Sequence, residues 1–194
     1  MESTTALCFG YHAAGDPANM AYHDDEWGRP IHDECKLLEL ICLEIFQVGL
    51  SWSTVLHKRL AFDEAFCGYD PDWMSRYNDA DMELLLADTR LIRNEAKFLA
   101  CITAAHAVAQ MHQMGQSLAD LIGLYRPKAY TRPKNAAARP KSTPDSVALS
   151  AALHNMGFRF IGPVNAYATM EACGIVNGHV LGCTVGDEID AMVS

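Results

Sequence analysis

The feature that most constrains this fold is a dense set of helix start and stop signals in a chain with few strand signals. Residues suited to a helix N-cap precede most of the apolar segments. No sustained alternation of apolar and polar residues is present, and no Asn-Gly or Asp-Gly pair joins two alternating segments into a hairpin. The sequence therefore predicts an all-α protein of roughly eight helices.

The predicted helices are located by their caps and stops. They start near Asp33, Ser51, Asp70, Asp79, Arg93, Ser117, Thr143 and Gly162. The last predicted helix ends at Gly174, and the acidic tail after Cys183 is expected to be loose. The one long connection without a helical pattern covers residues 126–144.

The helix predicted over residues 36–50 is apolar on nearly every side, so we expect it to be buried. Glu44 and Gln47 interrupt its apolar surface. A carboxylate in such a place is costly unless it is paired or hydrogen-bonded. Two interpretations stay open: Glu44 pairs with an arginine or a helix end, or it faces a ligand pocket.

Length and composition limit the number of domains and the class of protein. The chain has 194 residues, half of them apolar, which is enough for one compact unit. We expect residues 1–194 to form a single unit of two closely packed helical lobes, the central one spanning about 52–125. No apolar run approaches the roughly 20 residues of a membrane helix, and the N-terminus lacks a signal-peptide pattern, so a cytoplasmic protein without membrane association is expected.

The charge is uneven along the chain. The net charge of −9 argues against nonspecific binding of nucleic acid. Residues 126–141 nevertheless carry six Lys or Arg and no acid. This basic segment is either a solvated loop or a local contact for phosphates, through Arg132, Lys134 and Arg139 among others.

Cysteine and histidine spacing suggests a metal site. The seven cysteines are scattered through a chain without an export signal, so we interpret them as reduced. His179 and Cys183 are four residues apart and would share a face on a helical turn. With Cys8 and His23 they would form a closed, structural zinc site that ties the chain ends together. His12, His32 and Cys173 are competing ligands at this point.

Four segments of the sequence resemble the DNA-3-methyladenine glycosylase I family, which belongs to the helix-hairpin-helix base-excision glycosylases. They are residues 21–30, 37–59, 91–100 and 157–183, and the match spans roughly residues 8–183. The resemblance implies an all-α helix-hairpin-helix bundle with a structural zinc ion bound by Cys8, His23, His179 and Cys183. It also implies a monofunctional enzyme, expected to be a monomer, that releases 3-methyladenine and related N3-alkylpurines from double-stranded DNA.

The same resemblance assigns roles to individual residues. Glu44 matches the catalytic glutamate of the pocket, while Tyr22, Trp27, Trp52 and Gln47 match positions around the flipped base. A damaged base costs least to flip, and aromatic rings can stack on it.

The hairpin over residues 91–97 would hold the DNA backbone, with Arg93 and Lys97 adding charge. In the segment Tyr22–Trp27, Asp24 and Asp25 are expected to orient His23 or cap a turn, and Glu26 to be exposed.

Three departures from the family pattern bear on activity. Phe9 or Tyr11 replaces a pocket tryptophan, Ile45 and Phe46 follow the pocket glutamate where a small residue is usual, and Arg90 replaces a hairpin glycine. They leave open an alternative function, a non-catalytic or substrate-shifted lesion-binding protein of the same fold. A third interpretation, a zinc hydrolase, requires three protein ligands and a water.

Overall fold

The computed structural model describes residues 4–193 and confirms the all-α prediction: this part of the chain contains thirteen α-helices, two 3₁₀-helices and no strand. The first half comprises α1 (Thr5–Phe9), α2 (Tyr11–Ala14), α3 (Pro17–Asp25), α4 (Glu34–Gln47), α5 (Trp52–Leu56), α6 (Arg59–Ala65), η1 (Cys67–Tyr69), α7 (Pro71–Met74) and α8 (Asp79–Ala87). The second half comprises α9 (Glu95–Gln113), α10 (Leu118–Gly123), η2 (Ala136–Ala138), α11 (Pro144–Asn155), α12 (Pro163–Ala172) and α13 (Thr184–Val193).

Most of the predicted caps form. Side-chain oxygens of Asp33, Ser51, Asp70, Ser117 and Thr143 each accept a backbone N–H in the first turn of the following helix. These contacts satisfy N–H groups that have no partner inside the helix, so local sequence alone fixes these starts.

The predicted number of helices was too low. Three helices precede Asp33, beginning with the pair α1–α2 and continuing with α3, which Asp16 caps and Pro17 opens. The helix predicted after Ser51 is divided between α5 and α6. The tail after Cys183 is not loose, because it forms α13 and buries Val185 and Ile189 on one face.

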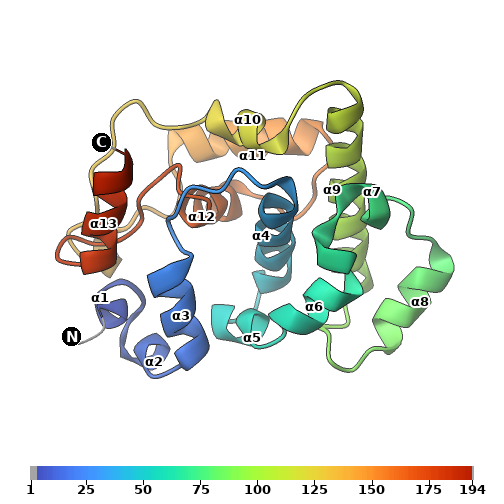
Figure 1. Cartoon of the computed structure of the whole chain (residues 1–194), viewed down its shortest axis with the longest axis horizontal. Helices are drawn as coiled ribbons and strands as arrows, with labels where there is room; N and C mark the ends of the chain where they lie inside the picture. Colours follow the sequence, from blue (N-terminus) through green and yellow to red (C-terminus); the bar gives the residue numbers. More distant parts are fainter. Residues whose placement is uncertain (1–3, 194) are drawn as a thin grey trace.

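Helix α4 lies near the middle of the molecule, between α12 and α9, with α5 continuing from its lower end (Figure 1). Ten of its fourteen residues are buried, as its apolar pattern predicts. Phe46 is fully buried, with its ring centroid 4.3 Å from that of Phe62 and 5.2 Å from that of Phe98. These core contacts hold α4, and with it Glu44, in a fixed position.

The two ends of the chain meet. Helix α1 (dark blue) lies beside the segment that leads into α13 (red) in Figure 1. Across this junction Thr4 Oγ1 lies 3.3 Å from Cys183 Sγ. Within the described residues, no helix is long and apolar enough to cross a membrane.

Candidate active site and metal centre

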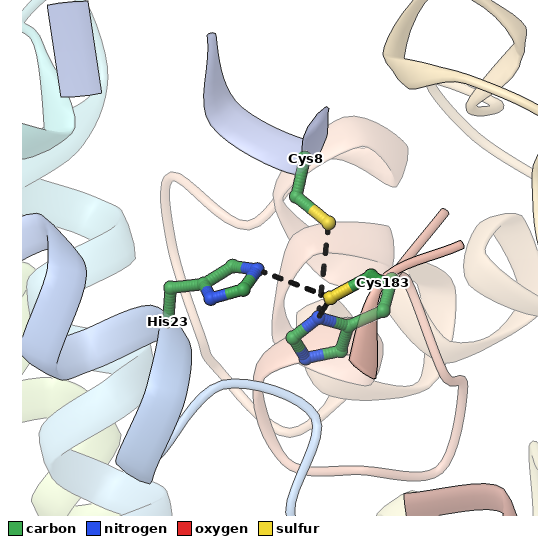
Figure 2. Close-up of side chains that lie close together, drawn as sticks. Cys8, His23 and Cys183 are labelled. Atoms are coloured by element: carbon green, nitrogen blue, oxygen red, sulfur yellow. Dashed lines mark hydrogen bonds between the residues drawn. The ribbon is translucent and has the colours of Figure 1, made fainter. Parts of the chain in front are cut away.

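A buried cluster of two cysteines and two histidines joins the chain ends. Cys183 Sγ lies 3.6 Å from His23 Nε2 and 3.3 Å from His179 Nδ1, and Cys8 Sγ lies 3.8 Å from His179 Nδ1. All four ligand atoms lie within 4.8 Å of one another, and all four residues are buried. Figure 2 shows Cys8, His23 and Cys183 converging from separate segments.

The spacing fits a tetrahedral ion. Zinc bonds of about 2.3 Å to sulfur and 2.0 Å to nitrogen place neighbouring ligand atoms roughly 3.3–3.8 Å apart. The outer ring nitrogens are also occupied: His23 Nδ1 bonds Asp24 Oδ1 at 2.6 Å, and His179 Nε2 donates to the Trp27 carbonyl at 2.9 Å. This pattern leaves His23 Nε2 and His179 Nδ1 free to face an ion.

His179 and Cys183 do not share the face of a helix, although their spacing predicted that they would. Residues 177–183 are not helical, so His179 and Cys183 approach each other across a turn closed by the Cys183 N–H and the Val180 carbonyl. His12, His32 and Cys173 are not members of the cluster found among the described residues. Four protein ligands leave no open position, which argues against the zinc-hydrolase interpretation.

A cavity of about 780 Å³ opens beside the cluster. Its walls come from α1, α2, α3, α4, α5 and α12 and from the segment before α11. The polar and aromatic residues of the lining include Phe9, Asp16, Tyr22, Trp27, Glu44, Gln47, Trp52, Arg139, Asn165 and Glu171. A volume of this size can enclose a purine base.

Glu44 faces this cavity, which decides between the two interpretations left open by the sequence. Its side chain is 7% exposed and no ion pair to it is found among the described residues. Asn165 Nδ2 donates to the Glu44 backbone carbonyl at 3.2 Å and holds α12 against α4. Burial, together with the nearby charge of Glu171, raises the pKa of Glu44 to about 8.

The aromatic residues occupy different positions in the wall. Tyr22 and Trp52 form a tilted pair with ring centroids 5.1 Å apart, and Trp52 is only half-buried. Trp27 is 5% exposed and is enclosed by Phe9 at 4.7 Å and His179 at 4.4 Å. Tyr22 is as buried as Trp27, so Trp52 is the more accessible aromatic surface of the wall.

A second buried carboxylate in the cavity was missed by the sequence analysis. Glu171 on α12 is 6% exposed, and burial raises its pKa to about 7 although Arg139 opposes the shift. Arg139 Nε lies 3.4 Å from Glu171 Oε1, and its guanidinium carbon lies 4.7 Å from the centre of the Trp27 ring. One sequence signal could have indicated its burial: Glu171 interrupts the apolar pattern of residues 163–174, in the same way that Glu44 interrupts the pattern of its own helix.

The departures from the family pattern leave the cavity open. Ile45 and Phe46 are fully buried in the core and take no part in lining the cavity. Phe9 lines it and supplies an aromatic ring against Trp27. Arg90 has no positive φ, and its guanidinium binds Asp88 at 2.8 Å and Glu64 at 2.6 Å on the surface.

Of the two residues predicted to contact the DNA backbone, only Arg93 is exposed. Lys97 is buried, and its ammonium donates to the backbone carbonyls of Phe46 at 2.9 Å and Val48 at 2.6 Å. This corrects the prediction for Lys97, because a lysine that closes the end of α4 is not available to a phosphate in this conformation.

The basic segment 126–141 is only partly a surface loop. Arg132 is buried and pairs with Asp187 at 2.5 Å and Asp190 at 3.1 Å, which anchors α13. Arg139 belongs to the cavity wall. Lys134 is exposed, as are Arg126, Lys128 and Lys141, so these four cations are the ones left for the predicted phosphate contact.

Glu26 is partly exposed, as expected, but it also has an ion-pair partner. Its carboxylate pairs with Arg59 at 2.7 Å, and Arg59 binds the buried Glu39 at 2.6 Å. This network joins the end of α3 to α4 and α6. Glu26 therefore has a structural partner, while Asp24 orients His23 as expected.

The all-helical fold that carries this cavity and Cys₂His₂ cluster is that of glycosylases that act on methylated DNA bases, as similar proteins show. A solved structure of 3-methyladenine DNA glycosylase I is similar at a TM-score of 0.84, with 43% identity and coverage of 87% of this chain and 94% of that one. The family model for methyladenine glycosylase matches residues 12–186. The chain belongs to the methyladenine glycosylase family.

Curated relatives agree. DNA-3-methyladenine glycosylase 1 of Escherichia coli (strain K12) is 43% identical over 171 residues, which cover 87% of this chain and 91% of that protein. The structure of 3-methyladenine DNA glycosylase I from Staphylococcus aureus is similar at a TM-score of 0.87, with 27% identity and coverage of 95% and 97% of the two chains. A variant of 3-methyladenine DNA glycosylase I solved in complex with 3-methyladenine has a TM-score of 0.86.

Proposed function

We propose that this protein releases 3-methyladenine from double-stranded DNA by hydrolysing the N-glycosidic bond of a base flipped into the 780 Å³ cavity. The observation that carries the proposal is Glu44, a buried carboxylate in the wall of an open cavity that the Tyr22–Trp52 aromatic pair also lines. Methylation at N3 gives adenine a positive charge and weakens its bond to the sugar. A carboxylate and aromatic faces suit a cationic base.

Each cavity residue has a defined part in this reaction. Tyr22 and Trp52 stack on the flipped ring, and Gln47 and Trp27 complete the wall that surrounds it. Glu44 stabilises the positive charge of the base as the bond breaks. Asp16 also lines the cavity, but its carboxylate already accepts bonds from Ala18, Asn19 and Ser53, so we assign it to capping α3.

The proposal also includes a contact with the DNA backbone and a structural metal ion. The hairpin 91–97 holds the DNA backbone, with Arg93 as its exposed cation. Zinc is the ion we propose for Cys8, His23, His179 and Cys183, and it holds the chain ends together. We further propose a monomer of two packed lobes in the cytoplasm, as expected for a protein that works on chromosomal DNA.

The alternative, a lesion-binding protein without catalysis, is not favoured. A cavity closed by Phe46 would have favoured it, but the Phe46 ring packs against Phe62 and Phe98 in the core. No observation of the structure supports a second function over the glycosylase.

The test is release of free 3-methyladenine from methylated duplex DNA by the purified protein and by Glu44→Gln. We expect release by the wild type and a loss of roughly 100-fold in kcat for the variant, because it lacks the charge that opposes the cationic base. Glu188→Gln is the matched control, since Glu188 is an exposed glutamate on α13 that pairs only loosely with Arg29 at 3.5 Å. A folded wild type that releases no base would refute the proposal.

A further inference from the structure

The cavity wall opposite α4 contains a polar pair that the proposed reaction does not use. Glu171 Oε1 is buried and has no hydrogen-bond donor in the described structure, although Arg139 Nε lies 3.4 Å away. Arg139 Nε is likewise without a hydrogen-bond partner there. A buried polar group left unsatisfied costs free energy, and native proteins retain few of them.

The surrounding structure makes room for this pair and holds it in place. A Cβ added at Gly178 would lie 2.5 Å from Glu171 Oε1 and 2.7 Å from the Trp27 ring, so only glycine fits there. Arg139 lies over the face of Trp27 and donates to the Cys8 carbonyl at 3.2 Å. These contacts fix a carboxylate and a guanidinium side by side in the wall of the cavity. Glu171 Oε1 and Arg139 Nε are themselves covered, so the second carboxylate oxygen and the remaining guanidinium N–H groups are the acceptor and donors that a base would meet.

We propose that Arg139 and Glu171 form a second base-recognition wall that selects adenine over guanine among N3-alkylated purines. This inference rests on the proposed function. The N7 edge of adenine presents the N6 amino group as a donor beside the N7 acceptor, whereas guanine presents two acceptors, O6 and N7. Glu171 accepts from the amino group and Arg139 donates to N7. A guanine would place O6 against the Glu171 carboxylate.

The test compares release of 3-methyladenine and 3-methylguanine from the same methylated duplex DNA at pH 8, above the Glu171 pKa of about 7. We expect Glu171→Gln to lower the ratio of the two kcat/KM values by roughly 10-fold, because its amide N–H can donate to O6. Glu188→Gln, which also removes a charge facing an arginine, should leave the ratio unchanged.

The ratio separates recognition from stability, since a partly unfolded variant loses both activities together. Arg139→Met is the second variant: without its cation Glu171 is no longer held, and the ratio should fall again. A ratio equal to that of the wild type in both variants would overturn the inference while leaving the proposed function intact.

A binding measurement covers the case in which the wild type cleaves nothing and the proposed function fails. Free 3-methyladenine and 3-methylguanine are titrated into wild type and Glu171→Gln by calorimetry. Selective binding of the adenine that the variant loses would support the second wall without cleavage. Equal affinity of the wild type for the two bases would overturn it.

Discussion

At the residue scale, the cavity is defined by two carboxylic acids that the fold keeps away from water. Glu44 and Glu171 come from α4 and α12, and the charge of Glu171 adds to the raised pKa of Glu44. An acid with a raised pKa in the folded state holds its proton after the unfolded chain has lost it. Between about pH 4.5 and 8 the unfolded state is therefore favoured increasingly as the pH rises.

A stability measurement tests this consequence. The free energy of unfolding of the wild type should fall as the pH rises from 5 to 9, and Glu44→Gln should reduce that fall by on the order of 3 kcal/mol. Urea denaturation at each pH gives the values, with Glu188→Gln as the exposed control. Parallel pH curves for wild type and Glu44→Gln would show that Glu44 is not held neutral in the empty cavity.

The pH dependence of activity should be opposite to that of stability. If the ionised form of Glu44 stabilises the cationic base, kcat/KM for 3-methyladenine release should rise with pH and level off above about 8, the pKa of Glu44 in the free enzyme. Glu44→Gln should show a lower rate without this rise. A wild-type rate that decreases through the same range would mean that the protonated acid is the active form.

At the element scale, Lys97 joins the predicted DNA-binding hairpin to the end of the helix that carries Glu44. Its ammonium satisfies two carbonyls at the end of α4, next to the turn that includes Val48 and leads to Trp52. The contact gives Lys97 a positioning role that its place in the sequence did not reveal. It was predicted as a phosphate contact because charge near a hairpin is usually exposed.

Lys97→Met and Arg93→Met should have different effects. Lys97→Met leaves two carbonyls without a donor and should lower the free energy of unfolding by roughly 1–3 kcal/mol. Arg93→Met should leave stability unchanged and reduce the slope of log K against log salt for DNA binding by about 1. Denaturation and binding titrations at several salt concentrations measure both quantities. The reverse pattern would restore Lys97 as the phosphate contact.

At the scale of the whole molecule, the Cys₂His₂ cluster joins three distant segments of the chain. Cys8 comes from α1, His23 from α3, and the other two ligands from the turn before α13. Arg132 adds to the same junction by donating to the carbonyls of His179, Val180 and Cys183. The ends of the chain are therefore held by the proposed ion and by Arg132 together.

Removal of metal should loosen this junction without dismantling the core around α4. We expect one zinc per chain by elemental analysis, and loss of it in Cys183→Ser. The variant or a chelated sample should show a lower Tm and faster proteolysis near the chain ends, because metal binding contributes directly to folding free energy. Cys67→Ser, an exposed cysteine outside the cluster, is the control. An unchanged Tm after verified metal removal would contradict a structural role.

The sequence by itself determined the elements whose causes are local. Caps such as Asp33 and Ser51 specify helix starts through bonds to the next turn, and the apolar pattern of α4 predicts its burial. Residue type and spacing indicated the pair His179 and Cys183, and the family resemblance completed the set of four residues that cluster. The pair meets across a turn and not along a helix.

The tertiary structure alone decided which charged residues are internal. Arg139, Arg132 and Lys97 are as polar as any surface residue, and nothing in their neighbouring sequence indicates their burial. For Glu171 the apolar pattern around it indicated burial but not its partner. Each depends on a group more than thirty residues away, such as Asp187 for Arg132. A buried charge is stable only when such a distant group offsets the loss of water, so its place follows from the folded chain and not from local pattern.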